Sequence, residues 1–333
     1  MDLVEKDLPA PHRWRRQLPW TAQQLHDAAL GEALRADVFD VVIAFGALGF
    51  SLLRGLLQGG TVQARCVWTD FTHIDTMMML PLARQPWRAN QLLEIGRVWG
   101  IEKAATQAST VTTACTSSDQ DRIRRWFRLS DVRLLENPIF DPQVPSGPLL
   151  IPRSPGDDVL LTGDLAHDAN VEGIRWFLER CLPMLRDDGV RNRITLAGRS
   201  PDRSIRQACR SHDDVTIIAD PSNEEMERIW SEGIVSLVPL QRASGSRIRI
   251  LDSVRRGIPV ISTSKGAEGL AHAEAPLIHI ADSPLDFAHE LANALSRPPS
   301  ESEQTSTSTW LTKHHSLAAF TSTVEGILSS VAG

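Results

Sequence analysis

The chain has 333 residues, a length typical of about two domains, and its 42% apolar and 23% charged residues are those of an ordinary globular protein. Its net charge of −6 comes entirely from residues 151–333, because residues 1–150 carry equal numbers of basic and acidic side chains. This balance argues against a general nucleic-acid-binding protein, which would show a basic surface.

The four cysteines lie in apolar or helical runs, form no C-x-x-C pair and follow no secretory signal. We therefore expect buried, reduced thiols in a cytoplasmic protein. The longest apolar run, residues 38–57, contains Asp40 and Arg54, and its uncharged part is shorter than the roughly 20 residues that a membrane-spanning helix needs. Residues 11–20 mix Arg with Trp between prolines, which predicts an irregular terminus or, as a second interpretation, peripheral contact with an anionic membrane.

In the first part of the chain, short apolar runs alternate with segments of helical periodicity, which predicts an α/β domain. Strands are expected at Val38–Ala44, Cys66–Thr69, Val111–Cys115 and Val132–Leu135. Helices are expected at Thr21–Leu34, Ser51–Leu57, Trp87–Ala105 and Asp119–Phe127, the last capped by residues 116–118. Residues 141–157 contain five prolines and two glycines and are the best candidate for a linker between domains.

After that linker the alternation is regular and predicts a doubly wound parallel sheet. Its strands are expected at Val159–Thr162, Arg193–Ala197, Val215–Ala219, Ile234–Leu240, Ile258–Thr263 and Leu277–Ile280. Its helices are expected at Val171–Leu185, Asp202–Ser211, Asn223–Ser231, Ser246–Arg256 and Pro284–Leu295. The polar residues 297–308 predict a flexible connector to a final helix, Trp310–Ser330.

Residues 243–270 carry the most informative pattern, a helix start followed by a strand and a Gly-rich loop. Ser244, Gly245 and Ser246 lie where exposed backbone N–H groups attract anions, and Arg247 and Arg249 add positive charge in the first turn. Because positive charge opposes the helix dipole there, two arginines indicate an anionic ligand. The alternative is a surface helix in which Arg249 pairs with Asp252.

Further motifs lie at matching positions before and after this stretch: Gly163, His167, Asn170 and Gly173 with Trp176-Phe177, Gly257-Ile-Pro-Val-Ile-Ser-Thr263, and Gly266-Ala-Glu-Gly-Leu270. In this order and spacing they resemble the nucleotide-sugar-binding half of the retaining family-4 (glycosyltransferase group 1) glycosyltransferases. The resemblance covers residues 159–295. In residues 1–145 it is looser, resting on Asp70-x-x-His73 and Glu136-Asn-Pro-Ile139. The family's first strand and Gly-rich loop are not found, so the amino-terminal domain is expected to be shortened.

The resemblance implies an α/β fold of two Rossmann-like domains that face each other across a cleft, each a parallel sheet with helices on both faces (the glycosyltransferase B, or GT-B, type). Residues 1–145 would form the acceptor-side domain and residues 146–300 the nucleotide-sugar-binding domain. Residues 309–333 would form a helix that packs back toward the first domain.

The resemblance also implies site residues. The donor would be bound by Gly163, His167, Arg247, Arg249, Asp252, Gly266, Glu268 and Gly269, and catalysis would involve Asp70, His73 and Arg247. Asp252 would accept hydrogen bonds from the ribose hydroxyls or, alternatively, pair with Arg249 or Arg256. Asn170 is expected to cap the helix that begins at Val171. Asp119-Gln-Asp121 looks like a metal-binding Asp-x-Asp motif, but its position at a helix start predicts capping, and no metal site is assigned.

The implied activity is transfer of a hexose-type sugar, with retention and without a metal or other cofactor, from a UDP- or GDP-sugar to an unknown acceptor. A glycan, a lipid-linked glycan or a small molecule would fit, and nucleic acid would not. The family's earlier acidic residue is replaced by Ser244, its usual Lys by Arg249 and its usual Glu by Asp252. Two alternatives therefore stay open: a catalytically degenerate module that binds a nucleotide sugar or a partner, and a sugar-nucleotide epimerase.

Overall fold

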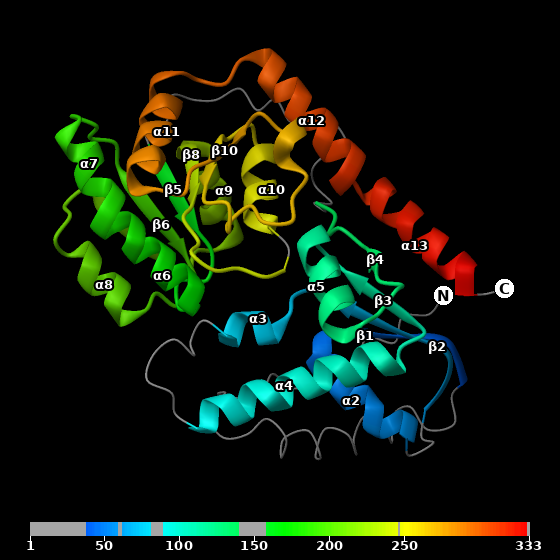
Figure 1. The fold of residues 1–333 in the computed structure, drawn as a ribbon. Coiled ribbons are helices and arrows are strands. Elements are labelled where there is room, and N and C mark those ends of the chain that lie inside the picture. The colour runs from blue at the N-terminus through cyan, green and yellow to red at the C-terminus, as the bar shows by residue number, and fades with distance from the viewer. Residues whose placement is uncertain (1–37, 59–61, 81–88, 140–157, 246, 332–333) are drawn as a thin grey trace.

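The computed structural model describes residues 38–58, 62–80, 89–139, 158–245 and 247–331. Within these ranges the chain forms two parallel β-sheets flanked by helices, which confirms the predicted α/β class (Figure 1). The predicted helix Thr21–Leu34, the Arg- and Trp-rich residues 11–20, the linker 141–157 with the domain boundary at residue 145, and Ser246 lie outside the described residues.

The first sheet has the strand order β1-β2-β3-β4 with parallel pairing throughout. The strands are β1 (Val38–Phe45), β2 (Gln63–Phe71), β3 (Val111–Ala114) and β4 (Arg133–Leu134). The helices that connect them are α2 (Gly46–Gln58), α3 (Asp75–Met79), α4 (Ala89–Ala108) and α5 (Ser117–Phe127). All four predicted strands form, and the sequence pattern misses only the short α3.

The second sheet has the order β10-β9-β8-β5-β6-β7, again all parallel. Its strands are β5 (Asp158–Thr162), β6 (Ile194–Gly198), β7 (Val215–Ala219), β8 (Gly233–Val238), β9 (Val260–Ser262) and β10 (Ile278–Ile280). Its helices are α6 (Asp168–Trp176), η2 (Phe177–Cys181), α7 (Leu182–Asp187), α8 (Arg203–Cys209), α9 (Asn223–Glu232), α10 (Ile248–Arg255), η3 (His272–Glu274) and α11 (Pro284–Ser296), followed by α12 (Glu301–His315) and α13 (Leu317–Val331).

Alternation along the strands explains why helices cover both faces of each sheet. In β2, Cys66 and Trp68 point to the face that α13 covers, where they pack with Ile327. Val67 and Phe71 point to the opposite face, which α2, α4 and α5 cover. In the second sheet, β5 and β6 are buried along their whole length, as expected for a parallel sheet between two helical layers. The predicted cysteine state is confirmed, because all four thiols are free and buried.

The single helix predicted at Val171–Leu185 is wrong in its start and in its continuity. The observed helix begins at Asp168, and a π-helical turn, Phe177–Cys181, separates α6 from α7. Pro183 lies in the first turn of α7, where it lacks an N–H to donate to the carbonyl of Glu179. The widened turn accommodates that missing hydrogen bond.

The predicted flexible connector at residues 297–308 is also wrong, because α12 begins at Glu301. Ser300 and Glu303 form a capping box: the Ser300 hydroxyl accepts from the Glu303 N–H at 3.3 Å, and the Glu303 carboxylate accepts from the Ser300 N–H at 2.8 Å. The final helix is therefore two helices, α12 and α13, which meet at Ser316.

The two terminal helices run from the second sheet to the first (Figure 1). In α12, Trp310 is buried against Ile250 and Leu251 of α10. In α13, Ile327 belongs to the apolar cluster over β2 and β3. Among the helices that the structure describes, none has both the length and the apolar content needed to span a bilayer.

Glu102 of α4 gives the first domain a distinctive pH dependence. Its side chain is fully buried and accepts hydrogen bonds from the N–H of Thr76 at 3.2 Å and from the Thr76 hydroxyl at 2.6 Å. Burial raises the pKa of Glu102 to about 7. Because the folded-state pKa lies above that of the unfolded chain, the stability that this group contributes is present in full at acid pH and is lost as the pH rises through 7.

We therefore expect Glu102→Gln to flatten this dependence. Relative to the wild type, the variant should gain about 3 kcal/mol in free energy of unfolding between pH 4 and pH 8, because Gln has no proton to lose. Urea denaturation at both pH values measures this difference. Glu94→Gln, an exposed change on the same helix, is the control. Parallel pH profiles for the wild type and Glu102→Gln would contradict the prediction.

Candidate functional site

The predicted donor-site residues meet at the carboxyl edge of the second sheet. Gly163 follows β5, the segment that carries Arg247 follows β8, and the loop of residues 263–270 follows β9. These three strands are neighbours in the sheet, so the loops that leave them are neighbours as well. Ligands of open parallel sheets bind at this edge.

Arg249 lies directly over Gly163. A Cβ atom at Gly163 would be 2.8 Å from the Arg249 Cζ, and the backbone there has a φ of +132°, which favours glycine. The Arg249 guanidinium donates from Nη2 to the Asn170 Oδ1 at 3.1 Å, and Asn170 Nδ2 in turn donates to the Asp164 carbonyl at 2.7 Å. Glycine is therefore required at position 163 to make room for an arginine that a neutral amide holds in place.

Arg247 is the buried member of the pair, with 6% of its surface exposed. Its Nη1 donates to the carbonyl of Gly245 at 2.7 Å, and its Nε has no hydrogen-bond partner among the described residues. Burial lowers the pKa of Arg247, and burial together with Arg247 lowers the pKa of Arg249 to about 10. Both guanidinium groups remain charged at neutral pH.

Among the residues that the structure describes, neither Arg247 nor Arg249 forms an ion pair within 4 Å, although the nearby carboxylates of Asp119 and Glu268 partly oppose the lowering of the Arg247 pKa by burial. A buried cation that no carboxylate contacts directly is costly, because buried charges are normally paired and hydrogen-bonded. The two arginines side by side at the start of α10 therefore form a site whose charge is complemented by an anion. A diphosphate suits it, because each guanidinium can bind two oxygens at once.

Asp252, one helical turn after Arg249 in α10, forms ion pairs with two other arginines. Its carboxylate lies 3.6 Å from the Arg256 Nη1 and 3.8 Å from the Arg255 Nη2. Of the two interpretations of this residue, pairing with Arg256 is thus present in the structure. The side chain remains about one-third exposed and can still accept hydrogen bonds.

The loop that follows β9 is folded against its own sheet and against the first domain. The Gly266 N–H donates to the Thr263 hydroxyl at 2.9 Å, and a Cβ at Gly266 would lie 2.6 Å from the Val238 carbonyl oxygen. Gly269 has a φ of +87°, and a Cβ there would be 2.5 Å from the Cβ of Thr116 in the first domain. Both glycines are thus required by close packing of the loop.

Glu268 forms ion pairs with Arg122 of α5 and with Lys265, the latter at 3.0 Å. Its side chain is mostly buried, and its Oε2 has no hydrogen-bond partner among the described residues. Glu268 thus joins the two domains beside the arginine pair.

The two predicted catalytic residues of the first domain lie at the carboxyl end of β2. Asp70 is buried and accepts from the Thr113 hydroxyl at 2.6 Å, and burial raises its pKa. His73 is half-exposed and forms an ion pair with Asp75 at 2.9 Å, and that hydrogen bond raises the pKa of His73. Only His73 approaches the second domain, where a Cβ at Gly245 would be 3.0 Å from its Cβ.

The predicted capping role of Asn170 is wrong. His167 is the N-cap of α6, and its carbonyl accepts from the N–H groups of Asn170 and Val171 at 2.9 and 3.0 Å. The His167 side chain is exposed and makes no cap hydrogen bond. Asn170 is instead inside the helix, where its amide faces Arg249 and Asp164.

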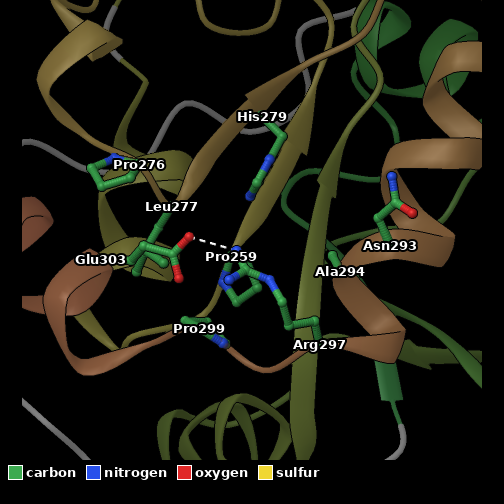
Figure 2. Close-up of a pocket in the computed structure, with 9 residues that line it drawn as sticks. All are labelled: Pro259, Pro276, Leu277, His279, Asn293, Ala294, Arg297, Pro299 and Glu303. Atoms are coloured by element: carbon green, nitrogen blue, oxygen red, sulfur yellow. Dashed lines mark hydrogen bonds and ion pairs between the residues drawn. The ribbon is translucent and has the colours of Figure 1, made fainter.

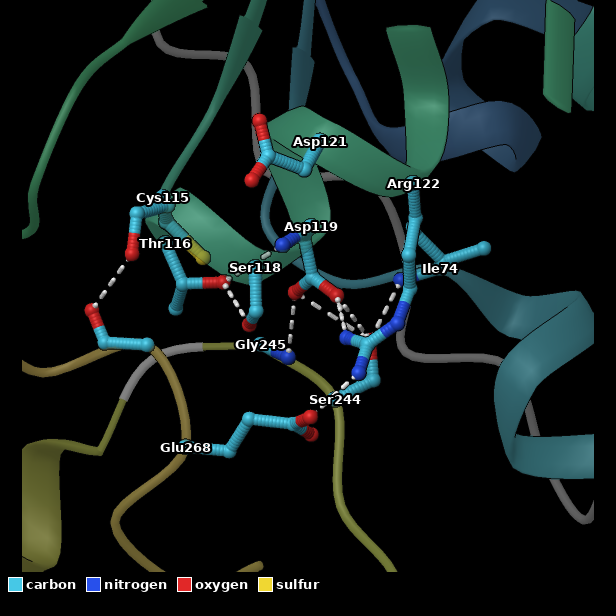
Figure 3. Close-up of polar contacts among 12 residues, drawn as sticks. Ile74, Cys115, Thr116, Ser118, Asp119, Asp121, Arg122, Ser244, Gly245 and Glu268 are labelled. Atoms are coloured by element: carbon cyan, nitrogen blue, oxygen red, sulfur yellow. Dashed lines mark hydrogen bonds and ion pairs between the residues drawn. The ribbon is translucent and has the colours of Figure 1, made fainter. Parts of the chain in front are cut away.

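Asp119 and Arg122 of α5, which the sequence pattern does not assign to the site, contact the second domain (Figure 3). Asp119 of α5 accepts from the Gly245 N–H at 2.9 Å and from Arg122 Nη1 at 2.8 Å. Ser244 Oγ accepts from the Ile74 N–H at 2.8 Å. The position of Asp119 at the start of α5 predicts only a capping role. The cap is instead Thr116, whose hydroxyl accepts from the Asp119 N–H at 3.1 Å. The burial of Asp119 has no signal in the sequence.

A pocket also lies at the opposite edge of the second sheet (Figure 2). Pro259 and Leu277, which line it, come just before β9 and β10, at the amino ends of those strands. Its volume of about 60 Å³ is far below the roughly 300 Å³ or more of a drug-sized ligand site. It cannot hold a nucleotide sugar.

Residues 156–297 match the model of the family "Glycosyl transferases group 1". Over 141 residues the chain is 27% identical to an uncharacterized 44.6 kDa protein in the cps region of Klebsiella pneumoniae, a match that covers 41% of this chain and 36% of that protein. The chain thus spans about a third of the length of that curated relative.

Solved structures match nearly the whole chain. Sucrose-phosphate synthase from Thermosynechococcus elongatus has a TM-score of 0.70 at 15% identity and covers 95% of this chain and 79% of its own. A UDP-forming α,α-trehalose-phosphate synthase from Burkholderia xenovorans has a TM-score of 0.66 at 15% identity, with 96% and 81% covered. The fold is therefore that of the GT-B glycosyltransferases, and residues 156–297 of it match the glycosyltransferase group 1 model.

Proposed function

We propose that this chain transfers a sugar from a UDP- or GDP-sugar to an acceptor hydroxyl with retention of configuration and without a metal ion. The observation that carries this proposal is the pair Arg247 and Arg249, which lies at the carboxyl edge of the second sheet with no ion-pair partner in the described residues. This is the charge that a departing nucleoside diphosphate requires.

In this mechanism the two guanidinium groups bind the diphosphate oxygens and stabilise the negative charge that develops as the bond to the sugar breaks. The acceptor attacks from the same face of the sugar, and the leaving phosphate takes its proton. Asp252 accepts hydrogen bonds from the ribose hydroxyls, and His73 approaches the donor from the first domain. The acceptor, a glycan, lipid-linked glycan or small molecule, then binds on the side of the first domain.

The names of the structural relatives support a nucleoside-diphosphate donor, because one of them is UDP-forming. A degenerate, binding-only module is the second candidate. The observation that favours it is Ser244, which stands where the resembling family carries an acidic residue and here contacts Asp119 and Ile74 instead of being free for a sugar.

A thermal-shift screen of UDP-, GDP-, TDP- and ADP-sugars tests donor binding, because a ligand of the folded state raises its apparent stability. We expect one nucleotide class to raise the Tm by several degrees, with or without EDTA. NMR of the product formed with an acceptor panel should then show the anomeric configuration of the donor. Binding without turnover would support the binding-only module, and an epimerised donor without acceptor would support an epimerase.

A further inference from the structure

Asp119 of the first domain contacts Ser244 and Gly245, the turn that precedes Arg247 (Figure 3). Its side chain is 1% exposed. The carboxylate accepts from the Gly245 N–H at 2.9 Å, while the Ser244 hydroxyl lies 3.3 and 3.4 Å from its two oxygens. The same hydroxyl accepts from the Ile74 N–H at 2.8 Å, so two first-domain groups hold this turn.

The turn is in direct contact with Arg247. The Gly245 N–H donates a hydrogen bond to Asp119, and the Gly245 carbonyl accepts one from Arg247 Nη1 at 2.7 Å. The φ of Gly245 is +85°, and a Cβ there would lie 2.6 Å from the Thr72 carbonyl oxygen. Asp119 and Arg247 thus hydrogen-bond to the Gly245 backbone on either side of its Cα, at the N–H and at the carbonyl.

Charge does not explain the position of Asp119. The carboxylate is already paired with Arg122, and Arg122 is shared with Glu268. A negative group this close to Arg247 opposes the binding of an anion by simple electrostatics. If the site binds a diphosphate, the hydrogen bond from the Gly245 N–H to Asp119 must therefore offset the electrostatic cost of this negative charge.

We propose that Asp119 is a positioning residue that fixes the backbone of Gly245 and, through that residue, the Arg247 guanidinium, so that the first domain orders the diphosphate site of the second. This inference rests on the proposed function. It assigns to α5 a part in donor binding that its helix-capping sequence does not indicate.

The experiment measures binding of inorganic pyrophosphate and of UDP by calorimetry to the full chain and to the variants Asp119→Ala and Asp119→Asn. Asp121→Asn is the matched control, since Asp121 lies on the same helix with its side chain 63% exposed. We expect Asp119→Ala to bind pyrophosphate about tenfold more weakly, because a buried N–H loses its acceptor. Asp119→Asn keeps one acceptor oxygen and should be weaker by about threefold.

The sign of the change separates this role from the others. Tighter pyrophosphate binding by Asp119→Asn would mean that Asp119 is an electrostatic competitor, and unchanged affinity with a lowered Tm would mean that it only joins the domains. Either result overturns the proposal. Asp119→Asn retains size and shape, so the test stands even if the alanine variant does not fold.

The failure of the proposed function gives a different result. If Arg247→Ala binds pyrophosphate as well as the wild type does, the diphosphate site itself is wrong, and so is the role of Asp119. If Arg247→Ala loses affinity while both Asp119 variants keep it, only the role of Asp119 is wrong. In the supporting case the Gly245 amide resonance in ¹⁵N NMR also shifts in Asp119→Asn, because its acceptor has lost its charge.

Discussion

Arg247→Ala is expected to weaken donor binding about 100-fold, because it removes a buried cation that can make two charge-assisted hydrogen bonds to the diphosphate, each worth about 1.5–3 kcal/mol. At a ligand concentration of 100 times the wild-type Kd, the donor stabilises the wild type by about 2.7 kcal/mol and would stabilise the variant by only about 0.4 kcal/mol. The ligand-induced rise in Tm should therefore almost disappear.

The ligand-free protein should behave differently. Arg247 is buried, its pKa is lowered by desolvation, and its Nε lacks a hydrogen-bond partner among the described residues. Its charge is therefore a cost to the empty protein, and we expect the Tm of ligand-free Arg247→Ala to be equal to or above that of the wild type. Sites built for binding commonly carry such a cost.

Two variants complete this experiment. Arg247→Lys keeps the charge but not the two-pronged geometry, so it should recover part of the affinity. Arg228→Ala removes an arginine of α9 whose side chain is 58% exposed and pairs with Glu232 at 3.0 Å, and it should leave donor binding unchanged. If Arg247→Ala binds the donor like Arg228→Ala, the arginine pair is not the diphosphate site.

Hydrophobic periodicity predicted the sheets well, because a buried parallel strand requires a continuous apolar run. β5, which is buried along its whole length, differs from its prediction by one residue. β7, a partly exposed strand at the edge of the sheet, lies at the predicted residues. The spacing of Ser300 and Glu303 is that of a capping box and could have predicted the start of α12, but the polar composition of residues 297–308 obscured it. Composition reports average solvation, whereas a helix needs only one buried face, which Thr307 and Trp310 provide here.

The grouping of the predicted site residues was predictable from topology, whereas their hydrogen-bond partners were not. Loops that follow neighbouring strands must lie together, which places Gly163 near Arg249. The side chain that Arg249 contacts depends on the residue at which α6 begins, because this start sets the direction of each α6 side chain. Since that helix starts at Asp168 rather than Val171, Asn170 points its amide to Arg249 instead of capping. The contact of Asp119 with Gly245 depends on how two domains meet, which no local pattern encodes.

Gly163→Ala is expected to abolish tight donor binding while leaving the protein folded. The new Cβ would lie 2.8 Å from the Arg249 Cζ, so the guanidinium must leave the position in which Asn170 holds it. The φ of +132° adds backbone strain of about 1–3 kcal/mol. Calorimetry with UDP should show a loss of at least tenfold in affinity, and urea denaturation should show a loss of about 2 kcal/mol in stability.

Two comparisons separate strain from the displacement of Arg249. Gly189→Ala introduces a Cβ at a φ of +83° with no atom within 4 Å, so it should cost stability without changing donor affinity. In a double-mutant cycle, Gly163→Ala should cost less stability when Arg249 is already Ala, because the clash is then absent and only the strain remains. Equal costs in both backgrounds would mean that Arg249 swings away freely. The glycine would then be required by the backbone alone, and Arg249 would not be held in place for a ligand.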